Sequence, residues 1–422
     1  MKLDLPFFSD DVDVQSFQTA QRQNFIAQGL PTRAQDNWKY TDVSFLKDLP
    51  LHAPVAVNPD LANFIQTKKV ANENLINIVV IDGTLSQKFS DLHLLPANII
   101  LTTLKQAVIE YPEKAKAFLM HHFDGQKYPF AVFNSATLQD GLFCYLPCDT
   151  QLSQPLHFIY ITTQSDCLFS LRNIVIADQR AQATVIEEYC DVVNNHNLTN
   201  VVTEIHVEKQ AQIQYHKLTR HAGQHQHFAN IFISQAREST VAFYSLTKQS
   251  ALHREEVIVN LQGEYAHATV NGFYHTHYDK QHVDHQIQIN HIVPLGTSKM
   301  LYKGVLEKPS KAIFNGKIYV HPEAQKSSSL QANHNLVLDK NAEVYTQPQF
   351  EIYADDVKCA HGATVGQLNA EALFFLRARG INKFEAMKLL THAFANDVFE
   401  TIKNPNILKH FQQAALETDH VG

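Results

Sequence analysis

Residues 182–189 read QATVIEEY, and three later stretches repeat their pattern: AQIQYHKL at 211–218, STVAFYSL at 239–246 and HATVNGFY at 267–274. Their equivalent apolar residues are separated by steps of 28, 28 and 29 residues, at Val185, Ile213, Val241 and Val270. The pattern returns after a gap of 44 residues, with a further step of 30, at Phe314 in KAIFNGKI and Val344 in NAEVYTQP. A strand repeat of this period predicts a solenoid, in which each coil buries its inner face by stacking on its neighbours.

Short β-branched runs separated by polar turns fill residues 131–366 and favour a mainly β fold, a parallel β-helix. A β-sandwich or a propeller is the alternative, but the evenly spaced hairpin turns and blade motifs of those folds are missing. Helical patterns lie on both sides of this region. We therefore expect a mixed, largely helical domain at residues 1–130, the β-helix core at 131–366 and a helical domain at 367–422.

Helix start and stop signals place the flanking helices. The first is expected at residues 11–28, where Gly29 ends it, and a second helical patch at 103–123 is divided by Pro112. After the β-helix, Asn369 and Asn382 are candidate helix caps, and a last helix follows Pro405.

Composition excludes several classes of protein. The chain has 422 residues, 45% of them hydrophobic, and a formal net charge of -7, without a basic run that would bind nucleic acid. No stretch of 18 apolar residues occurs and the N-terminus becomes acidic at once, so we expect a cytoplasmic chain that is not held in a membrane. Five cysteines without a CxxC pair argue against a disulfide framework and a zinc ribbon.

Common catalytic and nucleotide-binding motifs are also missing. The sequence contains no GxxxxGK[ST] loop, no GxSxG elbow and no GxGxxG after a strand. We therefore expect that this chain binds no nucleotide and is not itself an ATPase of the P-loop type.

The richest local group of possible metal ligands is HTHYDKQHVDHQIQINH at residues 275–291. It offers His275, His277, His282 and His285, and imidazoles suit Zn, Fe or Ni. One hypothesis is therefore a metal-dependent β-helix enzyme that uses these histidines. The alternative is that they are turn and surface histidines, since the chain has 24 in all.

Residues 351–366 read EIYADDVKCAHGATVG and place Cys359 two residues before His361. Side chains at i and i+2 of a strand share one face, so a thiol and an imidazole would lie side by side. The two could bind a soft metal or act as nucleophile and base, or Cys359 could be a small buried hydrophobe.

Several motifs together resemble the SufB/SufD family of iron–sulfur cluster assembly proteins. They are YKG at 302–304, F-x-G-x-I-x-V at 314–320, AQK at 324–326, Q-x-x-x-NL at 331–336 and, above all, EIYADDVKCAHGATVG at 351–366. The NWKY arm at 37–40, the chain length and the lack of a cysteine-rich N-terminal region resemble the SufD branch of the family more than the SufB branch.

The resemblance implies a right-handed parallel β-helix that pairs with the β-helix of SufB, and a C-terminal helical domain that docks the ATPase SufC. The chain would then be a non-catalytic scaffold subunit of the SUF system, within a SufBCD complex, with ATP hydrolysis left to SufC. A nascent Fe–S cluster or iron would be shared with SufB, in cluster building or iron acquisition, and a reduced flavin is suggested for the complexes of relatives. A homodimer is the alternative for the isolated chain, because the same strand edges could pair with themselves.

The resemblance also assigns roles to residues. His361 matches the family histidine proposed as a cluster or iron ligand at the SufB interface, and Cys359 matches a neighbouring cysteine whose necessity is open. Candidate contacts to SufC are Phe374, Phe375, Arg377, Arg379 and Phe394. Other matched positions are expected to be structural, namely Lys303, Gln325, Lys326, Gln331 and Asn335.

Overall fold

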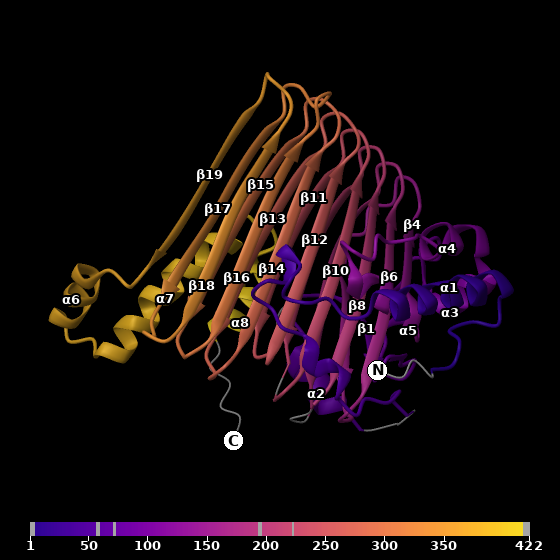
Figure 1. Ribbon diagram of the computed structural model, residues 1–422, viewed down its shortest axis with the longest axis horizontal. Coiled ribbons are helices and arrows are strands. Elements are labelled where there is room, and N and C mark those ends of the chain that lie inside the picture. Colours follow the sequence, from indigo (N-terminus) through magenta and orange to yellow (C-terminus); the bar gives the residue numbers. More distant parts are fainter. Residues whose placement is uncertain (1–4, 56–59, 71–72, 193–195, 222, 417–422) are drawn as a thin grey trace.

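Two β-sheets form the body of the molecule in the computed structural model, which describes residues 5–55, 60–70, 73–192, 196–221 and 223–416. One sheet has 10 strands and the other 9. From β4 onward, successive strands alternate between the sheets, and each pairs in parallel with the strand two places along the chain. Two strands make one coil of a β-solenoid of about seven turns, which confirms the predicted β-helix (Figure 1).

The strands and helices have the following bounds. The 10-stranded sheet contains β1 (Ile76–Ile81), β2 (Thr84–Leu85), β5 (Leu156–Thr162), β7 (Gln182–Asp191), β9 (Gln212–Arg220), β11 (Thr240–Lys248), β13 (His267–Thr276), β15 (Thr297–Leu306), β17 (Ser328–Val337) and β19 (Lys358–Gly366). The 9-stranded sheet contains β3 (Ile100–Thr103), β4 (Leu142–Leu146), β6 (Leu168–Ala177), β8 (Leu198–Val207), β10 (Gln226–Gln235), β12 (Leu252–Leu261), β14 (His282–His291), β16 (Lys311–Val320) and β18 (Glu343–Ile352). The helices are α1 (Val12–Gln28), α2 (Ala62–Lys68), α3 (Leu104–Glu110), α4 (Pro112–Leu119), α5 (Pro129–Thr137), α6 (Ala370–Ala378), α7 (Lys383–Phe399) and α8 (Pro405–Leu416), with short three-ten turns η1 (Asp36–Trp38), η2 (Ser44–Lys47) and η3 (Leu92–Leu94).

The register of the strands corrects part of the sequence repeat. Ile213 lies opposite Val241 as predicted, but Val185 lies opposite Tyr215, two residues from the predicted partner. Val270 is displaced by two residues in the same way, because its partner is Phe243. A slip of two residues keeps each side chain on the same face of its strand, so the inward pattern survives the error.

The later part of the repeat belongs to the opposite sheet. Phe314 lies on β16 and Val344 on β18, both in the 9-stranded sheet, whereas Val270 lies on β13 of the 10-stranded sheet. The gap of 44 residues therefore marks a change of sheet and not a longer coil.

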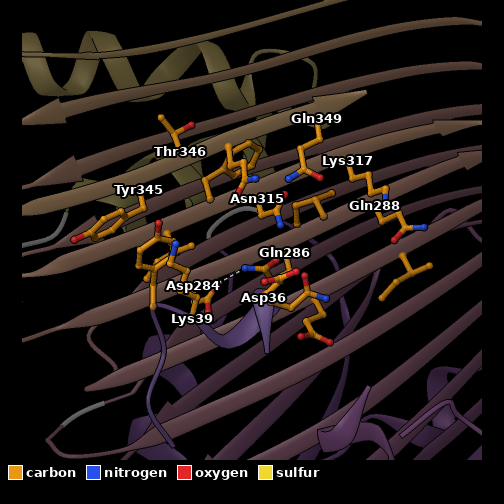
Figure 2. Close-up of a pocket in the computed structure, with 18 of the residues that line it drawn as sticks. Asp36, Lys39, Asp284, Gln286, Gln288, Asn315, Lys317, Tyr345, Thr346 and Gln349 are labelled. Carbon is orange, nitrogen blue, oxygen red and sulfur yellow. Dashed lines mark hydrogen bonds between the residues drawn. The ribbon is translucent and has the colours of Figure 1, made fainter. Parts of the chain in front are cut away.

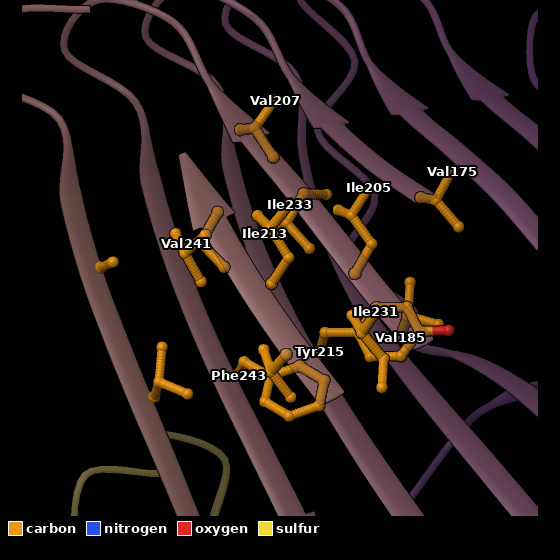
Figure 3. Packing of buried hydrophobic residues seen from close by; sticks show 14 of the residues in the cluster. Val175, Val185, Ile205, Val207, Ile213, Tyr215, Ile231, Ile233, Val241 and Phe243 are labelled. Atoms are coloured by element: carbon orange, nitrogen blue, oxygen red, sulfur yellow. The ribbon is translucent and has the colours of Figure 1, made fainter. Parts of the chain in front are cut away.

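The inner faces of both sheets form one apolar core along the solenoid. Figure 3 shows Val185, Ile213 and Val241 from one sheet beside Ile205 and Ile233 from the other, all buried. Burying such a side chain contributes about 1.5–3 kcal/mol. Stacking of coils is thus the main source of stability, as expected for a solenoid.

Helix boundaries follow the signals in the sequence. Asp11 caps α1, and Gly29 ends that helix with φ +70°, a conformation that glycine adopts without strain. Pro112 separates α3 from α4, as predicted. The side chains of Asn369 and Asn382 cap α6 and α7, which confirms both predicted caps.

Helices cover the outer faces of the sheets at the two ends of the chain. Phe130 and Phe133 of α5 pack with Phe228 on the 9-stranded sheet. Phe399 of α7 and Phe411 of α8 belong to an apolar cluster on the 10-stranded sheet. Helix α6 lies beyond the sheets at one end of the molecule, and no residue of it is buried (Figure 1).

Strands from the first 130 residues also join these sheets. β1 pairs in parallel with β5, and β3 pairs antiparallel with β4. The sheets therefore extend N-terminal to the boundary expected at residue 131. Among the described residues, no helix is long and apolar enough to cross a membrane. The last part of the expected C-terminal domain, residues 417–422, lies outside the described residues.

Candidate functional site at the open end of the solenoid

The last two strands, β18 and β19, form an open end of the solenoid. Each is the outermost strand of its sheet, so each pairs on one side only within the described chain. Most residues of β19 are exposed, and those of β18 are at most half-buried. Backbone groups and inward-facing side chains that later coils would otherwise cover are therefore available to a partner.

Cys359 and His361 lie on the inward face of β19. Their register partners on β17 are Ser329 and Gln331, which are both buried inside the solenoid. The two candidate ligands therefore share one face of β19, as their spacing predicts. Within the described chain, no further strand of the sheet lies beyond them at the open end.

The imidazole of His361 stacks on Phe350 of β18, with ring centroids 4.3 Å apart and an interplanar angle of 26°. This contact spans the two sheets at the end of the solenoid. The imidazole of His361 is exposed and has no hydrogen-bond partner among the described residues. One ring nitrogen of the imidazole is thus available to bind a metal ion.

Cys359 is half-buried and contacts the apolar core. Burial raises the pKa of this thiol above its ordinary value, although a backbone hydrogen bond from Ser329 opposes the effect. The isolated chain therefore holds Cys359 as a thiol, and a metal or another positive charge is needed to generate the thiolate ligand. One cysteine and one histidine supply only part of the roughly four ligands that an Fe–S cluster needs.

A hydrogen-bonded polar layer lies beneath the open end. Thr346 donates to the Asn333 side chain at 2.8 Å, and Asn335 donates to the same oxygen at 2.7 Å. Gln331 donates to the carbonyl of Gly316 at 2.7 Å. These bonds tie β16, β17 and β18 together and give Gln331 and Asn335 the structural surroundings expected from the sequence.

The five candidate partner contacts divide into two places. Phe374 and Phe375 of α6 are 74% and 53% exposed, and the Arg379 guanidinium lies 3.3 Å from the centroid of the Phe375 ring. Arg377 lies in the last turn of the same helix. Phe394 is apart from them, because it packs with α7 against the 10-stranded sheet, where the Lys303 ammonium lies 4.6 Å from its ring centroid.

The four histidines of residues 275–285 are not brought together. His275 contacts Glu307 at 3.2 Å, and its ring lies 5.3 Å from that of His277. His282 instead contacts Thr41 at 2.9 Å. His285 lies inside the solenoid between the rings of Tyr274 and Tyr302. Adjacent strand positions face opposite sides of a sheet and the chain changes sheet at this turn, so nearness in sequence does not give a shared site.

A polar groove that the sequence reasoning missed lies on the outer face of the 9-stranded sheet. It has a volume of about 870 Å³ beside the 36–40 arm, and Figure 2 shows Gln286, Gln288 and Lys317 along it. Tyr40 of the arm stacks on Tyr345, with centroids 4.2 Å apart. The signal was the alternation QIQIN at residues 286–290, which puts amides outward and isoleucines inward.

Comparison with known proteins identifies the family. Residues 160–394 match the family model described as "SUF system FeS cluster assembly, SufBD core domain", and residues 12–158 match the SufBD protein N-terminal region. The chain belongs to the SufBD family. The core match includes both strands of the open end and the Cys359–His361 pair.

Individual relatives agree with this assignment. An iron–sulfur cluster assembly SufBD family protein of Synechocystis is 29% identical over 390 residues, which are 88% of this chain and 84% of the relative. The iron–sulfur cluster assembly protein SufD of Escherichia coli is 27% identical over 389 residues, 91% of this chain and 88% of the relative. SufD of Bacillus subtilis is 23% identical over 399 residues, 91% and 89% of the two chains. The chain is thus most like SufD, as the NWKY arm, the chain length and the lack of a cysteine-rich N-terminal region predict.

Proposed function

We propose that this SufBD-family chain is a SufD-type scaffold subunit whose open end pairs with the β-solenoid of a SufB partner, so that nascent Fe–S clusters assemble at the joint. The observation that carries the proposal is the open end itself, where two edge strands and the free His361 imidazole are presented together. Membership of the SufBD family supports a role of this chain in Fe–S cluster assembly.

Strand edges and ligand chemistry explain why a second subunit is needed. Uncovered edge strands associate readily, and a matching solenoid end would continue both sheets and bury Phe350. His361 and Cys359 can supply two ligands, and the partner would supply the remainder, including thiolates. A ligand set divided in this way would assemble a cluster only when both subunits are present.

The C-terminal helices fit a second contact. Phe374 and Phe375 expose two aromatic rings on α6, outside the solenoid, where the docking of an ATPase subunit of the SufC kind would bury them. ATP hydrolysis would then belong to that partner, and the present chain would be a non-catalytic subunit. The cytoplasmic location, the part in iron acquisition and the reduced flavin remain predictions.

The test is anaerobic co-expression with SufB and SufC partners, purification through this chain, and assay of iron and sulfide. His361→Ala is compared with the native chain and with His93→Ala, which removes an exposed histidine of η3. We expect partners to co-purify in all three cases, with iron and sulfide lowered at least severalfold in His361→Ala only. Isolation of the chain without partners, or unchanged iron and sulfide in His361→Ala, would contradict the proposal.

A further inference from the structure

A column of inward-facing side chains beneath Cys359 changes from apolar to polar as it nears the open end. The strand register places Val241, Ala268, Ser298, Ser329 and Cys359 at successive positions of the 10-stranded sheet. The two serines are buried, with 3% and 1% of their surface exposed. A buried hydroxyl requires a hydrogen-bond partner, and the partners of these two lead away from the open end.

The serines form a hydrogen-bonded chain that ends at a buried histidine. Ser329 Oγ lies 2.8 Å from Ser298 Oγ, and Ser298 Oγ lies 2.9 Å from His291 Nε2. His291 is the last residue of β14 in the opposite sheet, and its side chain is buried. The chain therefore crosses the interior of the solenoid from one sheet to the other.

Cys359 lies at the outer end of this chain. It pairs with Ser329 on the same inward face, and a backbone hydrogen bond from Ser329 acts on its thiol. Neighbouring strands are about 4.8 Å apart, so a turn about the Cα–Cβ bond of Cys359 can bring Sγ within reach of Ser329 Oγ. A serine hydroxyl donates one hydrogen bond and accepts two, so Ser329 can bind the thiol and Ser298 together.

His291 is suited to pass a proton on without keeping it. Burial lowers the pKa of its imidazole to about 4, so the ring is neutral near pH 7. A neutral imidazole has one bare nitrogen and one N–H. Its Nδ1 atom lies beside Gly296, where an added Cβ would be 3.0 Å away, and residues 292–295 of the same turn are partly exposed. The far end of the chain is therefore close to water.

We propose that Ser329, Ser298 and His291 form a proton relay that removes the thiol proton of Cys359 when this residue becomes a metal ligand. The relay rests on the proposed function in one respect, because it takes Cys359 as a ligand at the joint. Cysteine binds a metal as the thiolate, so ligation releases a proton. Once a partner solenoid covers the open end, the relay offers this proton a route to the turn at residues 292–296.

The relay moves one proton at each step. As the metal–sulfur bond forms, the S–H bond of Cys359 breaks and its proton passes to Ser329 Oγ. Ser329 gives its own proton to Ser298, and Ser298 gives its own to His291 Nε2. His291 releases the Nδ1 proton to water, so one proton leaves for each thiolate that is bound. The Ser329 hydroxyl then donates to the thiolate, and a charge-assisted hydrogen bond of this kind stabilises it.

The first experiment measures how fast iodoacetamide alkylates Cys359 in the isolated full chain at pH 8, by mass spectrometry of each cysteine peptide. The exposed Cys148 is the internal reference. Only the thiolate reacts, so the rate reports how well the chain of hydroxyls stabilises it. We expect the rate to fall roughly tenfold in Ser329→Ala and roughly threefold in Ser298→Ala and His291→Phe, because hydrogen bonds to a charged group are strong.

Two controls separate the relay from changes in packing. Ser298→Thr adds a methyl group but keeps the hydroxyl, so its rate should stay within about twofold of the native rate. Ser327→Ala removes a buried hydroxyl that has no hydrogen-bond partner among the described residues, and it should leave the rate unchanged. A rate in Ser298→Thr as low as that in Ser298→Ala, or an unchanged rate in Ser329→Ala, would overturn the proposal.

A second measurement follows the proton itself. In ¹⁵N NMR of the histidine-labelled Cys148→Ser chain, the signals of His291 are identified by their loss in His291→Phe. The relay predicts the Nδ1–H tautomer while Cys359 is a thiol, and the Nε2–H tautomer after one equivalent of methylmercury has replaced the thiol proton. An unchanged tautomer would refute the relay. Because both measurements use this chain alone, they can succeed or fail independently of the co-purification with SufB and SufC.

Discussion

The ring of His361 stacks on that of Phe350 at 4.3 Å, and this contact joins the last strands of the two sheets. Phe350 thereby holds the imidazole over the open end in one orientation. We expect Phe350→Ala to lower the iron and sulfide content of the purified complex to less than half, because a mobile ligand must be ordered before it binds. Tyr353→Ala, at an exposed aromatic beside the same strand, is the matched control and should leave both unchanged. Equal losses in the two variants would show that the stacking has no specific role.

Gly304 lies at a position where the Cβ atom of any other residue would clash with a neighbouring tyrosine ring. A Cβ added there would lie 2.0 Å from the ring of Tyr274, and one added at Gly272 would lie 2.1 Å from the ring of Tyr302. The two glycines thus make room for two tyrosines in adjacent coils, with Gly272 opposite Tyr302 and Tyr274 opposite Gly304.

Gly304→Ala should therefore lower the free energy of unfolding by about 1–3 kcal/mol through overpacking. Gly362→Ala is the control, because nothing lies within 4 Å of its added Cβ. Denaturant unfolding of both variants measures the difference. If the two had equal stability, the tyrosine rings would have room to move.

The repeat of about 28–30 residues was sufficient to predict the solenoid, but it could not fix the register. An apolar residue at every second position makes slips of two residues look alike in sequence, as for Val185 and Val270. Pairing through backbone hydrogen bonds decides among them. Helix ends were easier to predict, since Asn369, Asn382 and Pro112 each act within one turn.

At the candidate site, too, the sequence predicts which neighbours on one strand share a face, but it does not predict contacts between the two sheets. Cys359 and His361 share a face because they are two residues apart on one strand, which sequence can reveal. The stacking partner of His361, Phe350, comes from the other sheet, and sequence spacing says nothing about it.

Lys303 ties α7 to the solenoid. Its ammonium donates to the carbonyl of Phe394 at 3.0 Å and to the Asp397 carboxylate at 2.5 Å, while the residue itself is buried. We expect Lys303→Met to lower the free energy of unfolding by about 1–3 kcal/mol, since charge-assisted hydrogen bonds are lost.

The variant should also make the α7 region more sensitive to limited proteolysis, followed by mass spectrometry of the fragments. Lys308→Met, at an exposed lysine beyond the same strand, provides the control. Native-like proteolysis in Lys303→Met would mean that apolar packing alone holds α7.

We expect His216 to make the folded chain sensitive to acid. It lies buried between the ring of Tyr244, at 5.1 Å, and that of Phe411 in α8, at 5.5 Å. Neither ring nitrogen has a hydrogen bond in the part of the chain that the structure describes. Burial lowers the pKa of His216 to about 3, whereas an unfolded histidine has a pKa of about 6.5.

Because the folded pKa is the lower one, acid stabilises the unfolded state: its histidine takes up a proton as the pH falls below about 6.5, and the folded state does not until about pH 3. This single group should therefore lower the free energy of unfolding by about 2 kcal/mol between pH 7.5 and pH 5. His216→Phe keeps the aromatic packing and removes the proton uptake, so its loss of stability over that range should be smaller by the same amount. Denaturant unfolding at both pH values measures it, with His93→Phe at an exposed position as the control. A pH dependence as steep as that of the native chain would show that His216 is protonated in the folded state or exposed to water.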